Sequence, residues 1–374
     1  MIIIAIYGNI IYKNKINKVL FCLPIIISIF TVFSYLAFAY EAFSWVKFSF
    51  DMSKILVLVL LPSVVAPLWF NYNDVYNNLI IMAIIMTIYI SIQTLAFRIG
   101  ISIPNLFRIG FIQPYVEGYT GVIVQSNLNM LRPAGMLTEP AFYSNYMGLI
   151  IPMYIEQNRT KMNVKKWCLI MFFVLGVIMS TSTTGIIFVG IILTFYILQA
   201  KNKTKILFLY LFLVLLLLIM LNNNIFNQLY NENAILSYTE NKLSNINYSG
   251  RVGRSYEVLN TLKGTSKLFG VGWGNANTYL INQGYIENSM YLNALTALIM
   301  NTGYVGCGLF LLLLLSLIIK SIKYKDSLSF ILLIQYTIRG SVSGMFFNTY
   351  GVLYLTIVFF KLYIEKRKIV QEVI

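Results

Sequence analysis

Arg251 and Arg254 lie three residues apart in the segment SGRVGR, within a polar interval that covers residues 222–288. A guanidinium group presents a rigid fork of hydrogen-bond donors that matches phosphate and carboxylate oxygens. The glycines of the segment allow a ligand to approach the backbone closely. This pattern therefore predicts an anion-binding segment. The alternative is that Arg254 pairs with Glu257 on one face of a helix.

A shorter segment, RPAGMLTEP, carries Arg132 and Glu139. Pro140 disfavours the helical conformation for Glu139 but suits the first turn of a helix that starts near Ala141. The carboxylate of Glu139 then faces the positive end of that helix. Glu139 either stabilises the helix terminus or acts as a general base beside an anion-binding arginine. We expect this segment and the SGRVGR segment to form one site.

Two further ionisable residues are candidates for the same site. Glu287 is a second candidate base, and the alternative for its segment is an N-terminal helix cap made by Asn288 or Ser289. Arg339 stands near the outer end of an apolar segment. An ionisable group inside a membrane is costly and usually functional, but so close to a helix end the side chain could also extend to the lipid headgroups.

The segment FGVGWGN, residues 269–275, resembles a phosphate-binding glycine loop only superficially, because the Gly-Lys-Ser/Thr of the Walker pattern is missing. We interpret it as a tight turn that packs close to the membrane surface. Trp273 then serves as an interfacial anchor or as a platform for a sugar ring.

The composition places these residues on a membrane protein. The chain has 374 residues, of which 58% are hydrophobic and 11% charged, whereas soluble domains carry about 25% charged residues. There is no histidine, which excludes histidine as a base or metal ligand and argues against a zinc site. We expect no metal site and no cofactor. The three cysteines lie in apolar segments and are interpreted as core residues. Because lysines and arginines orient membrane proteins, the net charge of +15 does not indicate nucleic-acid binding.

The elements that position the candidate residues are continuous apolar stretches, which predict membrane helices rather than a barrel. We expect an all-α polytopic membrane protein, a single domain over residues 1–374, with about 10–12 transmembrane helices. The expected spans cover residues 19–40, 55–70, 79–97, 141–155, 167–180, 185–198, 206–221, 303–319, 328–340 and 346–363, with 1–12 and 289–300 as possible additions.

Lysine and arginine clusters in the short loops give the orientation. With ten spans, five such clusters fall on one side, which is then the cytoplasm, and both termini lie there. A turn expected over residues 71–78 lies on the same side but carries no basic residue. The loops at 98–140 and 222–288 face outward. Most of the arginines stand in these outward loops or near an outer helix end, which the charge rule does not predict. A shared anionic ligand explains at least three of them, and the alternative is pairing with loop carboxylates or lipid headgroups.

In their order along the chain, these features resemble the bacterial O-antigen polymerase (Wzy) family and the related O-antigen ligases. The resemblance rests on Arg132, Gly135 and Glu139-Pro140, the hairpin sequence STTG at 182–185, Ser249-Gly250-Arg251, FGVG at 269–272, Glu287-Asn288 and Gly303-x-x-Gly306. Ligases of this family carry a His-Asn/Ser/Gln pair, nine residues, and then Gly-x-x-Gly. This chain has no histidine, and its nearest equivalent, Glu287-Asn288, stands farther from Gly303, which favours a polymerase.

The resemblance implies a C-type glycosyltransferase fold in the bacterial inner membrane. The implied donor is a glycan on undecaprenyl diphosphate, and the acceptor is a hydroxyl of an incoming lipid-linked repeat unit on the periplasmic face. No metal ion takes part. The residues expected on the diphosphate are Arg132, Arg251, Arg254 and Arg339, and the expected base is Glu139 or Glu287.

The partners implied are the undecaprenyl-diphosphate-linked oligosaccharide and the lipid bilayer, and by analogy a chain-length regulator and a flippase. Two alternative functions are an O-antigen ligase, which the missing histidine disfavours, and a lipid-linked oligosaccharide flippase or transporter. A transporter should show charged residues at helix midplanes and an internal repeat, and this sequence shows neither.

Overall fold

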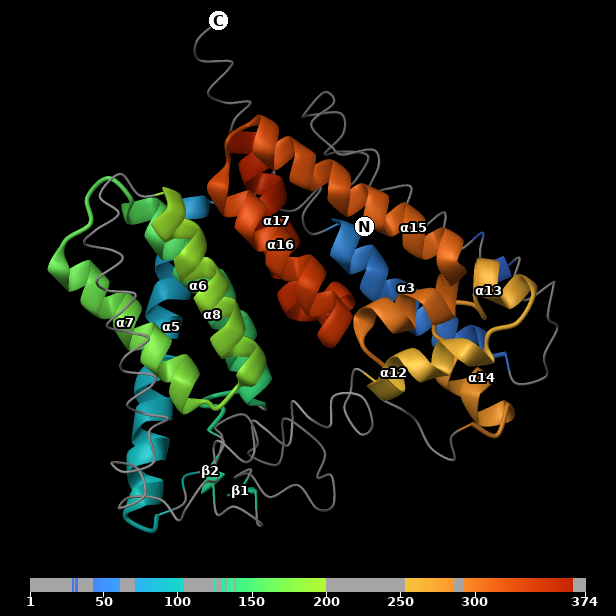
Figure 1. Ribbon diagram of the computed structural model, residues 1–374, viewed down its shortest axis with the longest axis horizontal. Coiled ribbons are helices and arrows are strands. Elements are labelled where there is room, and N and C mark those ends of the chain that lie inside the picture. The colour runs from blue at the N-terminus through green and yellow to red at the C-terminus, as the bar shows by residue number, and fades with distance from the viewer. Residues whose placement is uncertain are drawn as a thin grey trace, which may run out of the picture. The chain divides into compact units, whose positions relative to one another are not determined.

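The computed structural model describes residues 29, 31–32, 43–60, 71–101, 103, 124–125, 130–131, 133–137, 139–199, 253–285 and 292–365. Among them the fold is helical throughout except for one pair of two-residue strands. The chain divides into two compact units, Asn71–Ser244 and Met1–Phe70 with Asn245–Ile374, and each is described by itself (Figure 1).

The unit of residues 71–244 is built around a central buried helix, α6. Its helices are α5 (Tyr72–Arg98), α6 (Pro140–Asn158), α7 (Val164–Met179) and α8 (Thr183–Gln199), and its antiparallel strands are β1 (Val124–Gln125) and β2 (Met130–Leu131). Helix α6 packs against α5, α7 and α8, as Figure 1 shows. Every residue of α6 from Tyr143 to Ile155 is buried.

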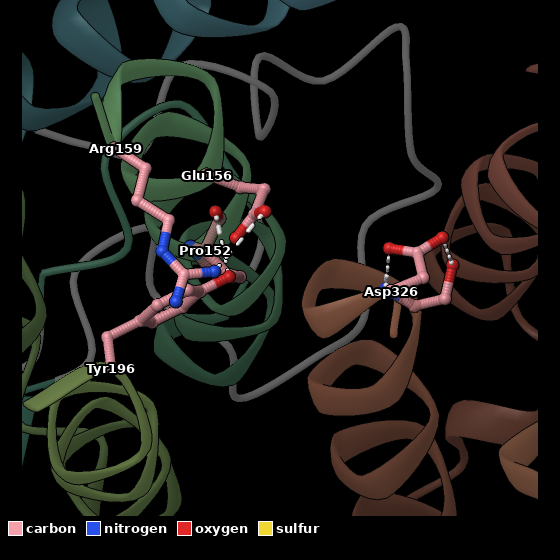
Figure 2. Close-up of polar contacts among 6 residues, drawn as sticks. Pro152, Glu156, Arg159, Tyr196 and Asp326 are labelled. Atoms are coloured by element: carbon pink, nitrogen blue, oxygen red, sulfur yellow. Dashed lines mark hydrogen bonds and ion pairs between the residues drawn. The ribbon is translucent and has the colours of Figure 1, made fainter. Parts of the chain in front are cut away.

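Polar contacts fix α6 within this bundle. The hydroxyls of Tyr143 and Thr87 lie 2.8 Å apart, and the hydroxyl of Tyr196 on α8 donates to the Pro152 carbonyl at 3.3 Å (Figure 2). At the carboxyl end of α6, Arg159 lies 3.8 Å from Glu156, also shown in Figure 2. This pair is partly exposed and contributes little to stability.

In the described part of this unit the predicted helices are found, with one change of extent. Helices α6, α7 and α8 match the spans expected at 141–155, 167–180 and 185–198, and the tight turn between α7 and α8 is where it was predicted. Helix α5 begins at Tyr72, so the expectation of a turn over residues 71–78 is wrong. The side chain of Asn71 accepts from the Asn73 amide, and Asp74 stands in the first turn, so these polar residues start the helix.

The other unit holds the long helix α15 and a set of short helices. Its elements are α3 (Trp45–Leu60), α12 (Gly253–Glu257), the 3₁₀-helix η3 (Val258–Thr261), α13 (Thr265–Phe269), α14 (Ala276–Asn282), α15 (Ala294–Lys323), α16 (Ser327–Val342), the 3₁₀-helix η4 (Met345–Phe347), α17 (Thr349–Phe359) and the π-helix η5 (Phe360–Glu365). Helix α16 packs against α15 and α17. Asp326 caps α16 by accepting from the amide of Ser329 at 3.3 Å, a contact drawn in Figure 2.

Helix α15 is kinked at Gly303, which has a φ of 67° and a ψ of −176°. The kink divides α15 into a half-helix from Ala294 to Thr302 and a long apolar part, in place of the separate helices expected at 289–300 and 303–319. The helix starts at Ala294 with Asn293 as its cap, and not at Ser289. Asn293 fits this role because its side chain accepts from the Thr296 amide.

Within the part of the chain that the structure describes, two helices are long and apolar enough to span a bilayer, Tyr72–Phe97 and Ala294–Lys323. Each has an exposed apolar face. On α5 this face carries Ile81, Ile85, Ile88 and Ile92, at the three- and four-residue spacing of one side of a helix.

The remaining expected spans are described in part. The shorter helices α16 and α17 with η5 match 328–340 and 346–363, while α3 begins ten residues before the span expected at 55–70. Segments 1–12, 61–70 and 206–221, and nearly all of 19–40, lie outside the described residues.

Candidate functional site

Glu139 occupies the position that the sequence predicted. It is the N-cap of α6, with a φ of −138° and a ψ of 146°, and Pro140 is the first helical residue. The helix therefore begins one residue earlier than expected. The Glu139 side chain makes no capping hydrogen bond and is partly exposed. A carboxylate at this place faces the positive helix terminus.

The chain just before Glu139 is held against α5 by Gln93. The Gln93 amide oxygen accepts from the Gly135 N–H at 2.9 Å, and its nitrogen donates to the Ile103 carbonyl at 3.1 Å. Gly135 has a φ of +66°, and a Cβ there would lie 3.0 Å from Ile90. Gln93 was not among the residues predicted for the site from the sequence. A polar amide within the apolar stretch 79–97 is the signal that could have found it.

The α7–α8 turn meets α6 one turn of helix after Glu139. The Ser182 hydroxyl donates to Ser144 Oγ at 3.0 Å, and the Gly185 N–H donates to Ser182 Oγ at 3.4 Å. A Cβ on Gly185 would collide with the Ser144 side chain. The preceding Thr181 has a φ of 53°, which is strained for a β-branched residue. The STTG motif thus packs against Ser144 in α6.

In the other unit, three segments meet at the amino end of α15. The Asn293 N–H donates to Ser255 Oγ at 2.8 Å, and the Ala294 N–H donates to the Ser343 carbonyl at 2.8 Å. The Tyr256 hydroxyl donates to the Ser341 carbonyl at 3.2 Å. We call this set of contacts the α15 junction. It joins α12, the start of α15 and the carboxyl end of α16.

The α15 junction brings together the elements that carry two of the predicted anion-binding arginines. Arg254 lies in α12 directly before Ser255, and Arg339 stands one turn before Ser343 on α16. Burial raises the pKa of the Tyr256 phenol, and Cys307 raises it further. The phenol therefore stays protonated at neutral pH and can donate its hydrogen bond across the junction.

Arg339 is enclosed by the unit, with 2% of its surface exposed. It interacts electrostatically with Tyr354 of α17, whose hydroxyl lies 3.5 Å from the side-chain oxygen of Gln335. An arginine that reached the headgroups would expose its guanidinium. The enclosed side chain is therefore at odds with that alternative and keeps a positive charge inside the α16–α17 pair.

The glycine-rich segment 269–275 packs onto the α15 kink. The Val271 N–H donates to the Met300 carbonyl at 2.8 Å, and the Gly272 N–H donates to the Asn301 carbonyl at 3.2 Å. The Gly274 N–H donates to Asn301 Oδ1 at 3.1 Å. These amides satisfy carbonyls that the kink releases from the helix. The segment is a tight turn, as predicted, but it binds a helix.

Trp273 is buried, with 5% of its surface exposed, so the expectation of an interfacial anchor or a sugar platform is wrong. Its backbone N–H donates to Thr31 Oγ1 at 3.1 Å, and the neighbouring Asn275 accepts from the Ser44 N–H at 2.8 Å. The turn is covered because α3 and its preceding segment pack over it.

Asn293 is a further residue that the sequence analysis missed. It caps α15 in place of Asn288 or Ser289. Nine residues separate Asn293 from Gly303, which is the spacing of the ligase pattern, and that spacing could have identified it. Leu292 stands where the ligase pattern has histidine.

The candidate residues fall into the two units. Glu139 lies in one unit, and Arg254 and Arg339 lie in the other, so their convergence on one substrate stays a prediction. Arg132, Arg251 and Glu287 lie outside the described residues, so the predictions for them are not tested. The side chain of Arg254 also lies outside them, and with it the alternative pairing of Arg254 with Glu257. Among the described residues, no group of three or more Cys, Asp or Glu could hold a metal ion.

Compared with known proteins, the chain matches no family model and no curated protein. The resemblance to O-antigen polymerases therefore stays a hypothesis that rests on the order of the motifs.

Proposed function

We propose that this protein is a polytopic inner-membrane glycosyltransferase that polymerises lipid-linked oligosaccharide repeat units. The observation that carries the proposal is the α15 junction, because it ties Arg254's helix and Arg339's helix to the positive amino end of a third helix. An arginine next to the positive amino end of a helix suits a diphosphate leaving group.

The reaction needs a base that takes the hydroxyl proton and groups that stabilise the departing diphosphate. The acceptor sugar hydroxyl attacks the anomeric carbon of the donor glycan, and the bond from that carbon to the diphosphate oxygen breaks. The hydroxyl proton passes to a carboxylate, Glu139 or Glu287. The diphosphate leaves with the bonding electrons, and Arg132, Arg251, Arg254 and Arg339 neutralise its negative charge. The bilayer holds both lipid tails and thereby orients the reacting carbon.

The proposed topology follows from the charge clusters. Both termini and the short lysine-rich loops are cytoplasmic, and segments 98–140 and 222–288 face the periplasm. A chain-length regulator and a flippase are proposed partners, because the substrate must cross the membrane before polymerisation and the product must stop at a defined length. No metal ion or cofactor is required.

The deciding experiment uses the purified full-length protein and undecaprenyl-diphosphate-linked repeat units extracted from cells that lack it. We expect a ladder of lipid-linked polymers that is unchanged by a chelator. The Glu139→Gln variant should lose about 10²- to 10⁴-fold in rate, as expected on loss of a general base. The matched control is Glu156→Gln on the same helix, which removes a carboxylate from the opposite end of α6.

Two outcomes contradict the proposed activity, and a third contradicts the assignment of Glu139 as the base. Translocation of the lipid-linked sugar across vesicles without bond formation would identify a transporter. Transfer of the glycan only to a lipid A core would identify a ligase. Equal rates for Glu139→Gln and the control would exclude Glu139 as the base and leave Glu287.

A further inference from the structure

Two buried side chains at the amino end of α15 each have a polar atom without a hydrogen-bond partner, unlike the equivalent caps and threonines in other described helices. Asn293 and Thr296 are completely buried, and neither Asn293 Nδ2 nor Thr296 Oγ1 has a hydrogen-bond partner. A buried polar group without a partner costs about 1–3 kcal/mol. Such groups in a folded protein call for an explanation.

The threonine hydroxyls of other helices show what Thr296 lacks. Thr87, Thr94, Thr302, Thr337 and Thr356 each donate to the carbonyl four residues earlier in the same helix. Thr296 stands in the first turn of α15, so the residue four positions earlier lies before the helix. Its hydroxyl consequently points past the helix start.

The caps of other helices show what is unusual about Asn293. Asn71 and Asn163 cap α5 and α7 from exposed positions, and Asn348 caps α17 from a partly exposed one. Asn293 caps α15 from a buried position. Its Oδ1 accepts from the Thr296 N–H at 2.8 Å, and this bond fixes which side-chain atom is oxygen and which is the donor Nδ2.

The surroundings select a negatively charged partner. Asn293 Nδ2 can only donate a hydrogen bond, and the amino end of a helix carries a partial positive charge. Arg254 stands on α12 directly before Ser255, whereas α16, the helix of Arg339, reaches this place with its carboxyl end. Glu257, the acidic residue of α12, is exposed and so directs its charge to solvent.

We infer that Asn293 Nδ2 and Thr296 Oγ1 bind an oxygen of the lipid-linked diphosphate at the amino end of α15. The inference rests on the function proposed above and adds two neutral donors to the arginines as ligands of the leaving group. Because both atoms are buried, the phosphate reaches them only when the segments of the α15 junction move apart. Binding is therefore coupled to opening of the junction.

Asn293→Asp separates this role from helix capping. Aspartate caps a helix as well as asparagine does, so Oδ1 still accepts from the Thr296 N–H, and circular dichroism checks that the variant is folded. The variant removes the Nδ2 donor and adds a negative charge that repels phosphate. The matched control is Asn348→Asp, which makes the same change at the cap of α17, where Asn348 Oδ1 accepts from the Gly351 N–H at 2.9 Å.

The experiment measures the affinity of the purified full-length protein for farnesyl diphosphate, with farnesol and inorganic diphosphate as separate probes. Asn293→Asp should weaken farnesyl diphosphate binding by about 10-fold or more, as expected for lost hydrogen bonds to a charged group, and Asn348→Asp should leave it unchanged. Thr296→Val should also weaken binding, and Thr296→Ser, which keeps the hydroxyl, should restore it. Binding of inorganic diphosphate with the same dependence on Asn293 would identify a general phosphate site rather than a lipid-specific one.

Equal affinity in the wild type, Asn293→Asp and Thr296→Val would overturn the inference and leave these atoms to a buried water molecule. That result is distinct from failure of the proposed function. If the wild type forms polymer while Asn293→Asp binds and polymerises normally, the function stands and the inference fails. If the wild type binds farnesyl diphosphate through Asn293 but forms no glycosidic bond, the phosphate site stands and the polymerase proposal fails.

Discussion

Replacing Gly303 by alanine tests whether the kink in α15 is required for the fold. Gly303 has a φ of 67° and a ψ of −176°, a conformation that is essentially restricted to glycine and costs other residues about 1–3 kcal/mol. A Cβ at Gly303 would also collide with the Leu268 carbonyl, and relief of such overpacking costs about 1–3 kcal/mol. The loss of chain entropy in the unfolded state offsets about 0.4–1 kcal/mol. We therefore expect Gly303→Ala to destabilise the protein by about 1–5 kcal/mol.

Gly308→Ala is the matched control, because Gly308 lies on the same helix and a Cβ there meets nothing within 4 Å. Alanine at this position should stabilise the protein by up to about 1 kcal/mol, so the two substitutions should act in opposite directions. The assay is unfolding of the full-length protein in mixed micelles by increasing SDS, followed by circular dichroism and tryptophan fluorescence. Equal midpoints for the two variants would refute the claim that the fold requires glycine at the kink.

Three further predictions concern the packing around the candidate site. Gly185→Ala should destabilise the protein by about 1–3 kcal/mol because the added Cβ collides with Ser144. Gly190→Ala on the same helix should not, because a Cβ there meets nothing within 4 Å. Equal effects of the two substitutions in the same SDS titration would contradict this prediction. Gln93→Leu removes the acceptor of the Gly135 N–H and should make the segment before α6 more sensitive to limited proteolysis, and unchanged cleavage would argue against that anchor. The pKa of Tyr256 is raised above its ordinary value of 10.0, so the wild type should lose stability as the pH rises above that value. The Tyr256→Phe variant should lose less stability over the same range. Parallel pH profiles of the two proteins would exclude a contribution from this residue.

Local signals in the sequence were sufficient to predict where a helix begins or ends when one residue fixes the backbone. Pro140 and Glu139 located the start of α6 to within one residue, and the polar run after α7 located the turn into α8. The polar residues of 71–78 were misread as a turn, because asparagine and aspartate favour both turns and helix starts. The pattern alone does not distinguish these two uses.

The short helices between residues 253 and 282 could not be predicted, because their stability comes from distant contacts. A five-residue helix such as α13 is too short to be stable alone. It is held because Gly270, at its end, lies against the backbone of Asn301 and Thr302, where a Cβ would stand 2.5 Å from both. No pattern within residues 265–270 records that contact. For the same reason Trp273 was expected at the membrane surface and is instead buried.

The kink at Gly303 links the glycine motifs to the proposed phosphate site, although none of these glycines belongs to the α15 junction. In a straight helix the carbonyls of Met300 and Asn301 would accept hydrogen bonds within the helix, and they would not be available to the Val271 and Gly272 N–H groups. The kink releases them, and it also sets the direction in which the half-helix 294–302 points its positive end. Gly303 thus determines where Asn293 and Thr296 lie relative to Ser255. Loss of activity in Gly303→Ala would therefore accompany loss of stability, whereas Asn293→Asp should weaken phosphate binding in a protein that remains folded.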